Sequence, residues 1–456
     1  MAAASTAVVG GPSPHAVWQW GPISQFLGVM TEAWDVTIIL TLSPILARVF
    51  LPSTVPTFIG AALVVVGFAV SYITRPIGSA IFGHFADRIG RRQLMIISMV
   101  SMAIVTVVVA AFPSYLQAGY LGYSLLLFVR ALVGIIYGGE YTAGYTFAQE
   151  WTPQKWRGLS GGLAIGGYGT GGLIGSLTLG ALIAYLGTNA MIAFGWRYVF
   201  ISGLVPFAIV IIIRLLIGET PIFKAEKASG KIEKSPVSTL FRAKTRPRFL
   251  QSMFVMLGFG TVYAVPFAYL SAMLTSHPSV LTTAQTVLPF DAFYLANIIA
   301  AIVVGGMMSQ YVGRRKLLMT MAVVILIAIV PTMYGIVTYA SLGNVLTVSA
   351  LAFVLGLLVE TPYGVFPSYL TERFGTSHRA AGSGLAYSLG GNTIPGLFLI
   401  FLVPPMVSAL GGSVWMVAGI FAVSGTIVGL IAAFAGPETV NVKLEEVEAE
   451  PAKTSA

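Results

Sequence analysis

Apolar stretches of about 20 residues recur along the whole chain, and no other feature of the sequence restricts its fold as strongly. A helix of this length crosses the roughly 30 Å hydrocarbon core of a bilayer. The hydrophobic share of 56% and the charged share of 9% leave too little polar surface for a water-soluble globule. We therefore expect an all-α membrane protein with twelve transmembrane helices. The stretches lie near residues 25–49, 57–82, 93–112, 121–148, 159–185, 195–217, 249–275, 290–310, 317–339, 345–370, 380–408 and 413–435.

Three sequence landmarks occur twice in the same order, and each second copy lies about 220 residues after the first. One match of this kind is weak evidence, but three in register indicate two homologous halves. We expect these halves to form two pseudo-symmetric six-helix bundles. The first copies are Gly83–Arg92, Glu150 with Arg157, and Glu219-Thr220-Pro221; the second copies are Gly306–Arg315, Glu372 with Arg379, and Pro437-Glu438-Thr439.

One long polar connection divides the chain into six spans plus six. Two six-helix halves with a site between them near the midplane are a recurring plan of transporters. The expected organisation is an N-terminal tail (1–24), a six-helix bundle (25–217), a linker (218–248), a second six-helix bundle (249–435) and an acidic tail (436–456).

Lys and Arg gather in alternate loops, which explains the net charge of +9 without a nucleic-acid partner. The intervening loops, around residues 113–120, 186–194, 276–289, 340–344 and 409–412, contain neither residue. By the positive-inside rule the basic loops are cytoplasmic, and so are both termini of a chain placed in the cell (inner) membrane. Cationic loops also bind the phosphates of membrane lipids.

The chain has no Cys, and its four His are scattered in a terminus and loops. Thiolate sites and His pairs at metal-ligand spacing are therefore missing from the sequence. We expect no metal, no cofactor and no enzymatic activity. The expected partners are a small-molecule substrate, protons and membrane lipid, bound by a monomer.

The loop Gly83-xxx-Asp87-Arg88-x-Gly90-Arg91-Arg92 resembles the signature loop of the major facilitator superfamily. Three further segments resemble the metabolite:H+ symporter group of that superfamily: Arg75-Pro76-x-Gly78, Trp34-Asp35, and Arg130-xxx-Gly134-xxx-Gly138-Gly139-Glu140. The resemblance covers nearly the whole chain. It implies the two-bundle fold and proton-driven transport of carboxylates, zwitterions and related small metabolites.

Two acids, Glu32 and Asp35, lie three residues apart in the first span, roughly 10 Å and 15 Å into the membrane. Two such close carboxylates cannot both ionise cheaply, so one is expected to hold a proton near neutral pH. Alternatively, Glu32 extends to the aqueous interface and leaves Asp35 as the buried acid. Glu140 in the fourth span lies at the depth of Asp35. We expect these three acids to carry proton coupling.

Arg130 in the fourth span has two possible uses, binding a substrate carboxylate or neutralising an acid of another span. Glu360 is the exceptional buried acid of the second half. Together with Tyr263 and Asn297, these residues are the expected substrate contacts.

The signature loop and its copy are expected to form gates at the cytoplasmic surface, where acids can hold cations or meet helix N-termini. The copy has Gln310 in place of the acid Asp87, so it should be the weaker latch. A plainer interpretation is that the arginines orient the protein and bind lipid phosphates. The expected gating residues are Asp87, Arg88, Arg91, Arg92, Glu150, Arg157, Glu372 and Arg379.

These observations predict a proton-coupled secondary transporter, a symporter of a small polar or anionic metabolite such as a carboxylate or zwitterion, working by alternating access. Two alternatives stay open at this point. One is an uncoupled facilitator of a small metabolite. The other is a membrane sensor built on a transporter scaffold.

Overall fold

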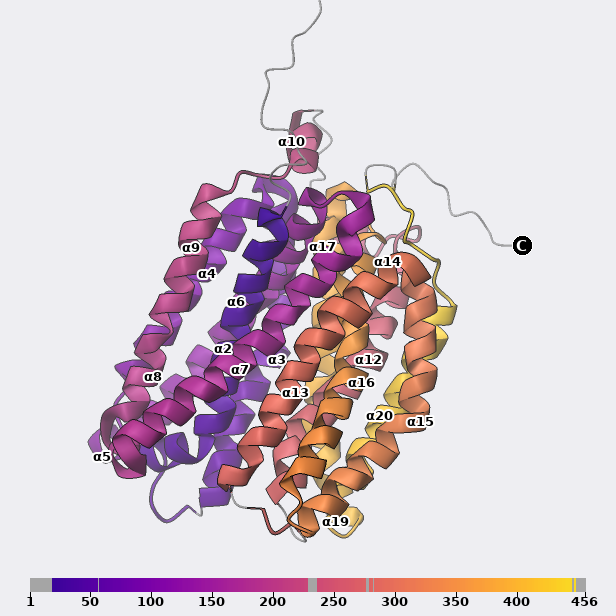
Figure 1. Ribbon diagram of the computed structural model, residues 1–456. Helices are drawn as coiled ribbons and strands as arrows, with labels where there is room; N and C mark the ends of the chain where they lie inside the picture. Colours follow the sequence, from indigo (N-terminus) through magenta and orange to yellow (C-terminus); the bar gives the residue numbers. More distant parts are fainter. Residues whose placement is uncertain are drawn as a thin grey trace, which may run out of the picture.

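The structure is a computed structural model, which describes residues 19–55, 57–228, 236–275, 279–281, 283–444 and 447. Within these residues all regular elements are helices, and the long ones run side by side along the molecule (Figure 1). Ten segments are long and apolar enough to cross a membrane. One of them, Gln154–Leu216, holds two spans that turn back at Gly187, whose φ of 75° lies in the left-handed region. With α3 (Thr57–Ile89) added, the expected twelve spans are accounted for.

The helices of each half follow one another along the chain. The first half comprises α2 (Trp20–Phe50), α3, α4 (Arg91–Ala110), α5 (Tyr115–Ala118), α6 (Leu121–Trp151), α7 (Arg157–Ala190), α8 (Trp196–Ser202) and α9 (Leu204–Leu216). The second comprises α12 (Arg246–Thr275), α13 (Val287–Ile299), η4 (Ala300–Met308), α14 (Ser309–Val312), α15 (Arg314–Ser341), α16 (Val345–Thr371), α17 (Arg379–Ala386), η6 (Tyr387–Thr393), α18 (Ile394–Leu397), η7 (Phe398–Leu402), α19 (Val403–Ala409) and α20 (Val414–Phe434). Between and within them lie α10 (Pro221–Ala228), α11 (Pro236–Thr239), η1 (Gln154–Trp156), η2 (Met191–Gly195), η3 (Thr283–Thr286) and η5 (Thr376–His378).

Several helices extend beyond the apolar stretches that predict them. The first span begins at Trp20 rather than residue 25, and the second continues to Ile89. Hydropathy marks the part of a helix that lies in hydrocarbon, whereas backbone hydrogen bonding continues into the polar interface. The polar ends thereby place charged loop residues on ordered helical turns.

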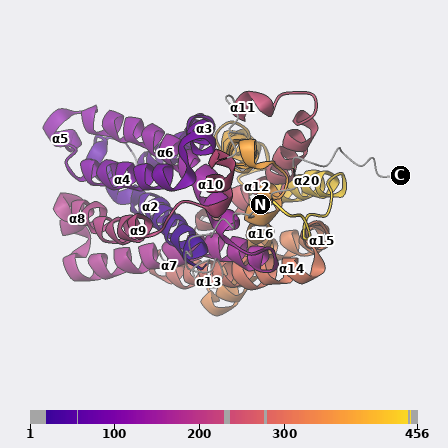
Figure 2. The same ribbon diagram turned by 90° about the horizontal axis from the view of Figure 1, so that it is seen from above.

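The two halves lie next to each other in both views, with the first half on the left and the second on the right (Figures 1 and 2). Between them α7 packs on α13, η4 and α16, and α3 packs on α17 and η6. With the packing of α6 on α17 and α16, these contacts use the second, fourth and fifth spans of the first half and the eighth, tenth and eleventh of the second. The sequence duplication therefore appears as a symmetric interface.

Glycine allows α7 and η4 to cross with their backbones in contact. A Cβ on Gly162 would lie 2.3 Å from the Ala301 carbonyl oxygen and 2.6 Å from the Gly306 Cα. The glycine density of the fifth span predicts such a close approach, which small residues permit between membrane helices. η4 and η6, on the second-half side of the interface, are π-helical, a form found often at functional sites.

Candidate functional site

A small cavity lies between the two halves. Seven of its thirteen lining residues are tyrosines. The rings touch across the interface, with centroids 4.5 Å apart for Tyr141 and Tyr387 and 6.1 Å apart for Tyr168 and Tyr263. The tyrosines are Tyr72, Tyr141, Tyr145 and Tyr168 from the first half and Tyr263, Tyr363 and Tyr387 from the second.

Glu360 of α16 is the one charged residue that lines this cavity. Its side chain is 2% exposed, and its Oε2 has no hydrogen-bond partner. Among the described residues, no Lys or Arg forms an ion pair with it. Tyr263 also lines the cavity, so two of the expected substrate contacts meet there. Asn297 does not: it is buried against Gly356, where α13 meets α16.

Glu32 and Arg75 form an ion pair beside the cavity. The Arg75 Nη2 lies 2.8 Å from the Glu32 Oε1, while its Nη1 donates to the Asn392 Oδ1 at 3.2 Å. The guanidinium also lies over the Tyr72 ring, 4.4 Å from the centroid. Because Asn392 belongs to η6 and lines the cavity, Arg75 connects a buried acid of the first half to the second half. Glu32 is 0% exposed and does not reach the aqueous interface.

Arg130 neutralises Asp35 in this structure, which is one of the two uses expected for it. The two side chains meet in a bidentate pair, with N–O distances of 2.8 Å and 3.2 Å. Neither residue lines the cavity. Glu32 and Asp35 thus face different arginines, and the arrangement is not that of two carboxylates sharing a proton. The sequence spacing placed the acids on one helical face but did not show that each has its own cation.

Glu140 lies inside the first bundle and is paired with Arg214 of α9. The Arg214 Nη1 donates to the Glu140 Oε2 at 2.8 Å, and the Nη2 contacts the Oε1. The Ser98 hydroxyl donates to the same Oε2 at 2.7 Å. Arg214 and Arg75 are the site residues that sequence reasoning missed as partners. The sequence does indicate both arginines by their position within apolar spans, because an arginine there requires a nearby anion or a cavity.

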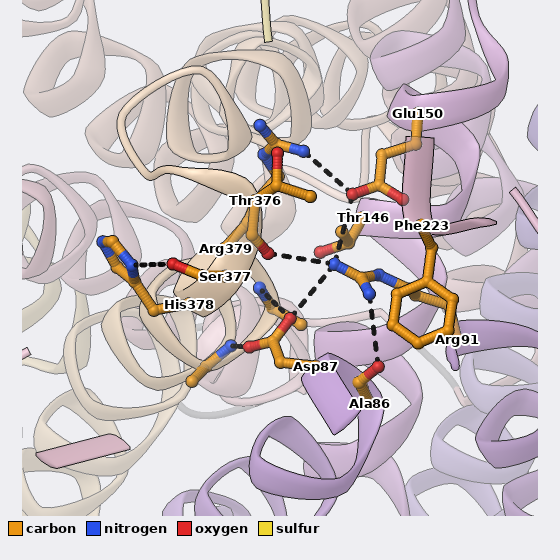
Figure 3. Close-up of polar contacts among 12 residues, drawn as sticks. Ala86, Asp87, Arg91, Thr146, Glu150, Phe223, Thr376, Ser377, His378 and Arg379 are labelled. Carbon is orange, nitrogen blue, oxygen red and sulfur yellow. Dashed lines mark hydrogen bonds and ion pairs between the residues drawn. The ribbon is translucent and has the colours of Figure 1, made fainter. Parts of the chain in front are cut away.

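Asp87 joins the halves at the end of the molecule that carries the basic loops, here called the basic end (Figure 3). Its carboxylate accepts the backbone N–H groups of Ala380 (3.3 Å) and Ala381 (3.1 Å), in the first turn of α17. A helix N-terminus favours negative charge. Asp87 also accepts a hydrogen bond from Arg91 at 3.2 Å.

Glu150 holds two arginines from different halves (Figure 3). Its Oε1 accepts hydrogen bonds from Arg91 at 3.3 Å and from Arg379 at 2.8 Å. Arg91 donates to the Thr376 carbonyl at 3.2 Å as well. All three charged side chains are buried. The network therefore closes the basic end by contacts between α4, α6 and the start of α17.

The second half repeats parts of this network. Gln310 accepts the backbone N–H of Gly158, at the start of α7, at 3.0 Å. Arg314 approaches Glu372 at 3.4 Å. Asp87 receives two backbone N–H groups with its carboxyl group, whereas Gln310 receives one from Gly158 with a neutral amide.

The third landmark closes each signature loop. Gly90 and Gly313 have φ of 119° and 106°. A Cβ there would lie 2.3 Å from Glu219 and 2.4 Å from Glu438. Glu219 accepts a backbone N–H from the first turn of α4 (3.1 Å), and Glu438 one from the first turn of α15 (2.7 Å). Burial raises the pKa of Glu219, and it raises the pKa of Glu372 against the opposing effect of the Arg314 charge.

Two of the expected gating arginines contact only their own half. Arg88 is exposed and pairs with the His84 ring at 3.0 Å. Arg92 donates to the Leu215 carbonyl at 2.7 Å and so satisfies the C-terminal end of α9.

The C-terminal segment after α20 lies across the basic end. Arg157 donates to the Val442 carbonyl at 2.8 Å, and Arg379 donates to the Leu444 carbonyl at 2.7 Å. Leu444 is 0% exposed. The expected acidic tail (436–456) is therefore packed on both halves at least to Leu444; its acids Glu445, Glu446, Glu448 and Glu450 lie outside the described residues.

Among the residues that the structure describes, no group of three His, Asp or Glu side chains could hold a metal ion. The site is a tyrosine-lined cavity with buried ion pairs beside it and an ionic network at one end. Such an arrangement can bind a small polar molecule and can gain or lose protons.

Comparisons with known proteins agree on the kind of protein that this chain resembles. The family model of the Major Facilitator Superfamily matches residues 25–398. A putative metabolite transport protein of Haemophilus influenzae is 30% identical over 390 residues, covering 83% of this chain and 86% of that protein. The inner membrane metabolite transport protein YhjE of Escherichia coli is 28% identical, covering 80% and 83%.

A third relative is the ectoine/proline transporter ProP of Corynebacterium glutamicum, 27% identical, with 73% of this chain and 68% of that protein covered. Among solved structures, the proton:xylose symporter XylE superposes with a TM-score of 0.74 at 20% identity, covering 96% of this chain and 99% of XylE. At this identity the likeness shows the fold.

Removing one partner of the Glu140–Arg214 pair should destabilise the first bundle strongly. In Glu140→Leu, the Arg214 charge stays buried without a counter-charge, at a cost of about 3–5 kcal/mol. The double variant Glu140→Leu/Arg214→Leu should recover much of this loss. Thermal unfolding in detergent measures both, with the exposed Arg88→Gln as control. A single variant as stable as the parent would contradict the pairing.

Loss of Asp87 should open the basic end more than loss of Gln310. Hydrogen bonds to a charged group contribute about 1.5–3 kcal/mol, which shifts a two-state equilibrium by roughly tenfold or more. Because the chain has no Cys, spin labels on cysteines introduced at Lys155 and Lys316 report one distance between the halves. Asp87→Ala should populate longer distances than the matched control Gln310→Ala. Equal distributions in both variants would show that Asp87 is not the stronger latch.

Proposed function

The chain belongs to the Major Facilitator Superfamily, and from this premise we propose that it is a proton-coupled symporter of a small polar or anionic metabolite, such as a carboxylate or zwitterion. Its named relatives are membrane transporters, and it is itself a transporter rather than an enzyme. The substrate moves by alternating access between the two halves. We further propose a monomer in the inner membrane, with the basic end and both termini on the cytoplasmic side.

The observation that carries the proposal is the Glu32–Arg75 pair behind the cavity lining, where Arg75 lies over the Tyr72 ring and donates to Asn392. A proton on Glu32 removes the counter-charge of Arg75, whose guanidinium is then free to bind an anionic group of the substrate. Conversely, an anionic group at Arg75 favours the protonated form of Glu32. The proton and the substrate therefore bind cooperatively, which is the thermodynamic requirement for symport.

The remaining expected site residues take roles that follow from their distance to the cavity. Glu360 and Tyr263 contact the substrate. Two further ion pairs lie behind the cavity lining, Asp35 with Arg130 and Glu140 with Arg214. They can pass or store protons within the first bundle.

Alternating access assigns the basic end a gating role. The network of Asp87, Arg91, Glu150 and Arg379 holds that end closed while the substrate loads from the other side. Its contacts must break before the substrate leaves toward the basic end. Arg157 and Glu372 support the same closed arrangement.

Transport in proteoliposomes tests the coupling. A panel of proline, ectoine, glycine betaine and shikimate, compounds named for the relatives, first identifies a transported solute. Glu32→Gln should then abolish accumulation driven by an inward proton gradient but keep exchange of labelled for unlabelled solute. Asp35→Asn should reduce accumulation less, because its partner Arg130 donates to Asp35, whereas Arg75 also donates to Asn392 of the cavity lining. Arg88→Gln serves as control.

The facilitator alternative makes a different prediction. An uncoupled carrier takes up no protons when solute is added, so a pH indicator inside the vesicles should stay constant in the parent protein. Undiminished uphill uptake by both Glu32→Gln and Asp35→Asn would overturn the assignment of these acids.

A further inference from the structure

When it is ionised, Glu360 gives the cavity a net negative charge. The neighbouring Glu32–Arg75 pair is neutral as a unit, and the other two acids of the first bundle described above also have arginine partners. Among the residues that the structure describes, no Lys or Arg pairs with Glu360. A carboxyl group in such surroundings is stable in its ionised form only when a bound cation neutralises it; otherwise it holds a proton.

The surroundings of Glu360 select the kind of cation. Tyr263, Tyr363 and Tyr387 come from the same half as Glu360, and their ring centroids lie 5.1 Å (Tyr263–Tyr363) and 6.2 Å (Tyr363–Tyr387) apart. Tyrosine faces attract organic ammonium groups, and cages of such rings recognise quaternary ammonium compounds. A metal ion would need several oxygen or nitrogen ligands instead, and Glu360 is the single carboxylate of the cavity.

Other residues of the cavity lining suit an anionic or hydrogen-bonding end of the same ligand. Asn392 lines the cavity, and Arg75 donates to it. Within the described part of the chain, the hydroxyl of the buried Tyr263 has no hydrogen-bond partner, so it can donate to a bound molecule. A carboxyl group in the lining and a guanidinium that donates to another lining residue match a dipolar solute.

We propose that the substrate carries a substituted ammonium group, which binds between Glu360 and the tyrosine rings, and that any carboxylate it has lies toward Arg75 and Asn392. The proposal rests on the proposed function in taking this cavity as the transport site. It narrows the substrate class to small organic cations and zwitterions and excludes simple carboxylate anions.

Calorimetric binding to the purified protein in detergent tests the proposal. Choline supplies the cation, glycine betaine the zwitterion, and 3,3-dimethylbutan-1-ol the uncharged isostere of choline. An ammonium compound should bind about tenfold or more tightly than the uncharged isostere. Comparable affinity for the uncharged isostere, or tighter binding of acetate than of either ammonium compound, would overturn the proposal without any variant.

Substitutions at two positions of the cavity locate the effect. Glu360→Gln keeps the shape but loses the charge, and should weaken binding of the ammonium compounds at least about tenfold. Asp291→Asn is the matched control, because Asp291 is an acid of the second half that does not line the cavity. Tyr363→Phe keeps the ring face and should retain most of the affinity, whereas Tyr363→Leu should lose several-fold.

Failure of this proposal and failure of proton coupling are distinguishable. The binding measurement uses no gradient, so it stays valid if the protein proves to be a facilitator. If Glu360 serves only as a proton carrier, Glu360→Gln will bind ammonium compounds as the parent does, which contradicts the proposal even when the variant no longer accumulates solute.

Discussion

A charge placed inside an apolar bundle must meet an opposite charge, and this requirement organises the structure. Each of the three acids in the spans of the first half meets an arginine on another helix, so the pairs connect α2 to α3, α2 to α6, and α6 to α9. Such pairs add little net stability compared with apolar packing, but leaving either partner alone is costly. They therefore define which helices are neighbours and in which register they pack. Glu360 stands out because it lines the cavity and, within the described part of the chain, forms no such pair.

The duplicated sequence produces symmetry at the basic end and asymmetry at the centre. At the basic end each signature loop uses a glycine with positive φ, an arginine on a buried glutamate and a carboxylate over a helix N-terminus. These contacts depend mostly on backbone geometry, so both copies can keep them. At the centre, the cavity takes Glu360 from the second half, while its neighbouring ion pair comes from the first. The scaffold is thus shared by the halves, and the charges that can act on a substrate are divided between them.

The spans and the repeat are predictable from the sequence because both are local properties. The pairings are not. Arg75 and Arg214 are visible as cations within apolar stretches, but their partners depend on which helices become neighbours. The sequence predicts Asn297 at the cavity, but its side chain faces another helix. Each residue turns a helix by about 100°, and hydropathy does not fix the rotation of a helix in an interior that is polar on several sides. The contacts of Val442 and Leu444 use backbone carbonyls, which every residue carries, so no pattern of residue types could indicate them.

The eleventh span connects the cavity to the gate. The helical segment Arg379–Leu397 runs without interruption from the network at the basic end, through η6, to the cavity. Its first turn is held by Asp87, and its π-helical middle carries Asn392, which accepts the hydrogen bond from Arg75. Rigid elements with two discrete packings carry coupling between distant sites. Under the proposed function, a change of Arg75 on loading would act on the same helix whose first turn is bound by Asp87, and a π-helical segment is a suitable place for that helix to bend.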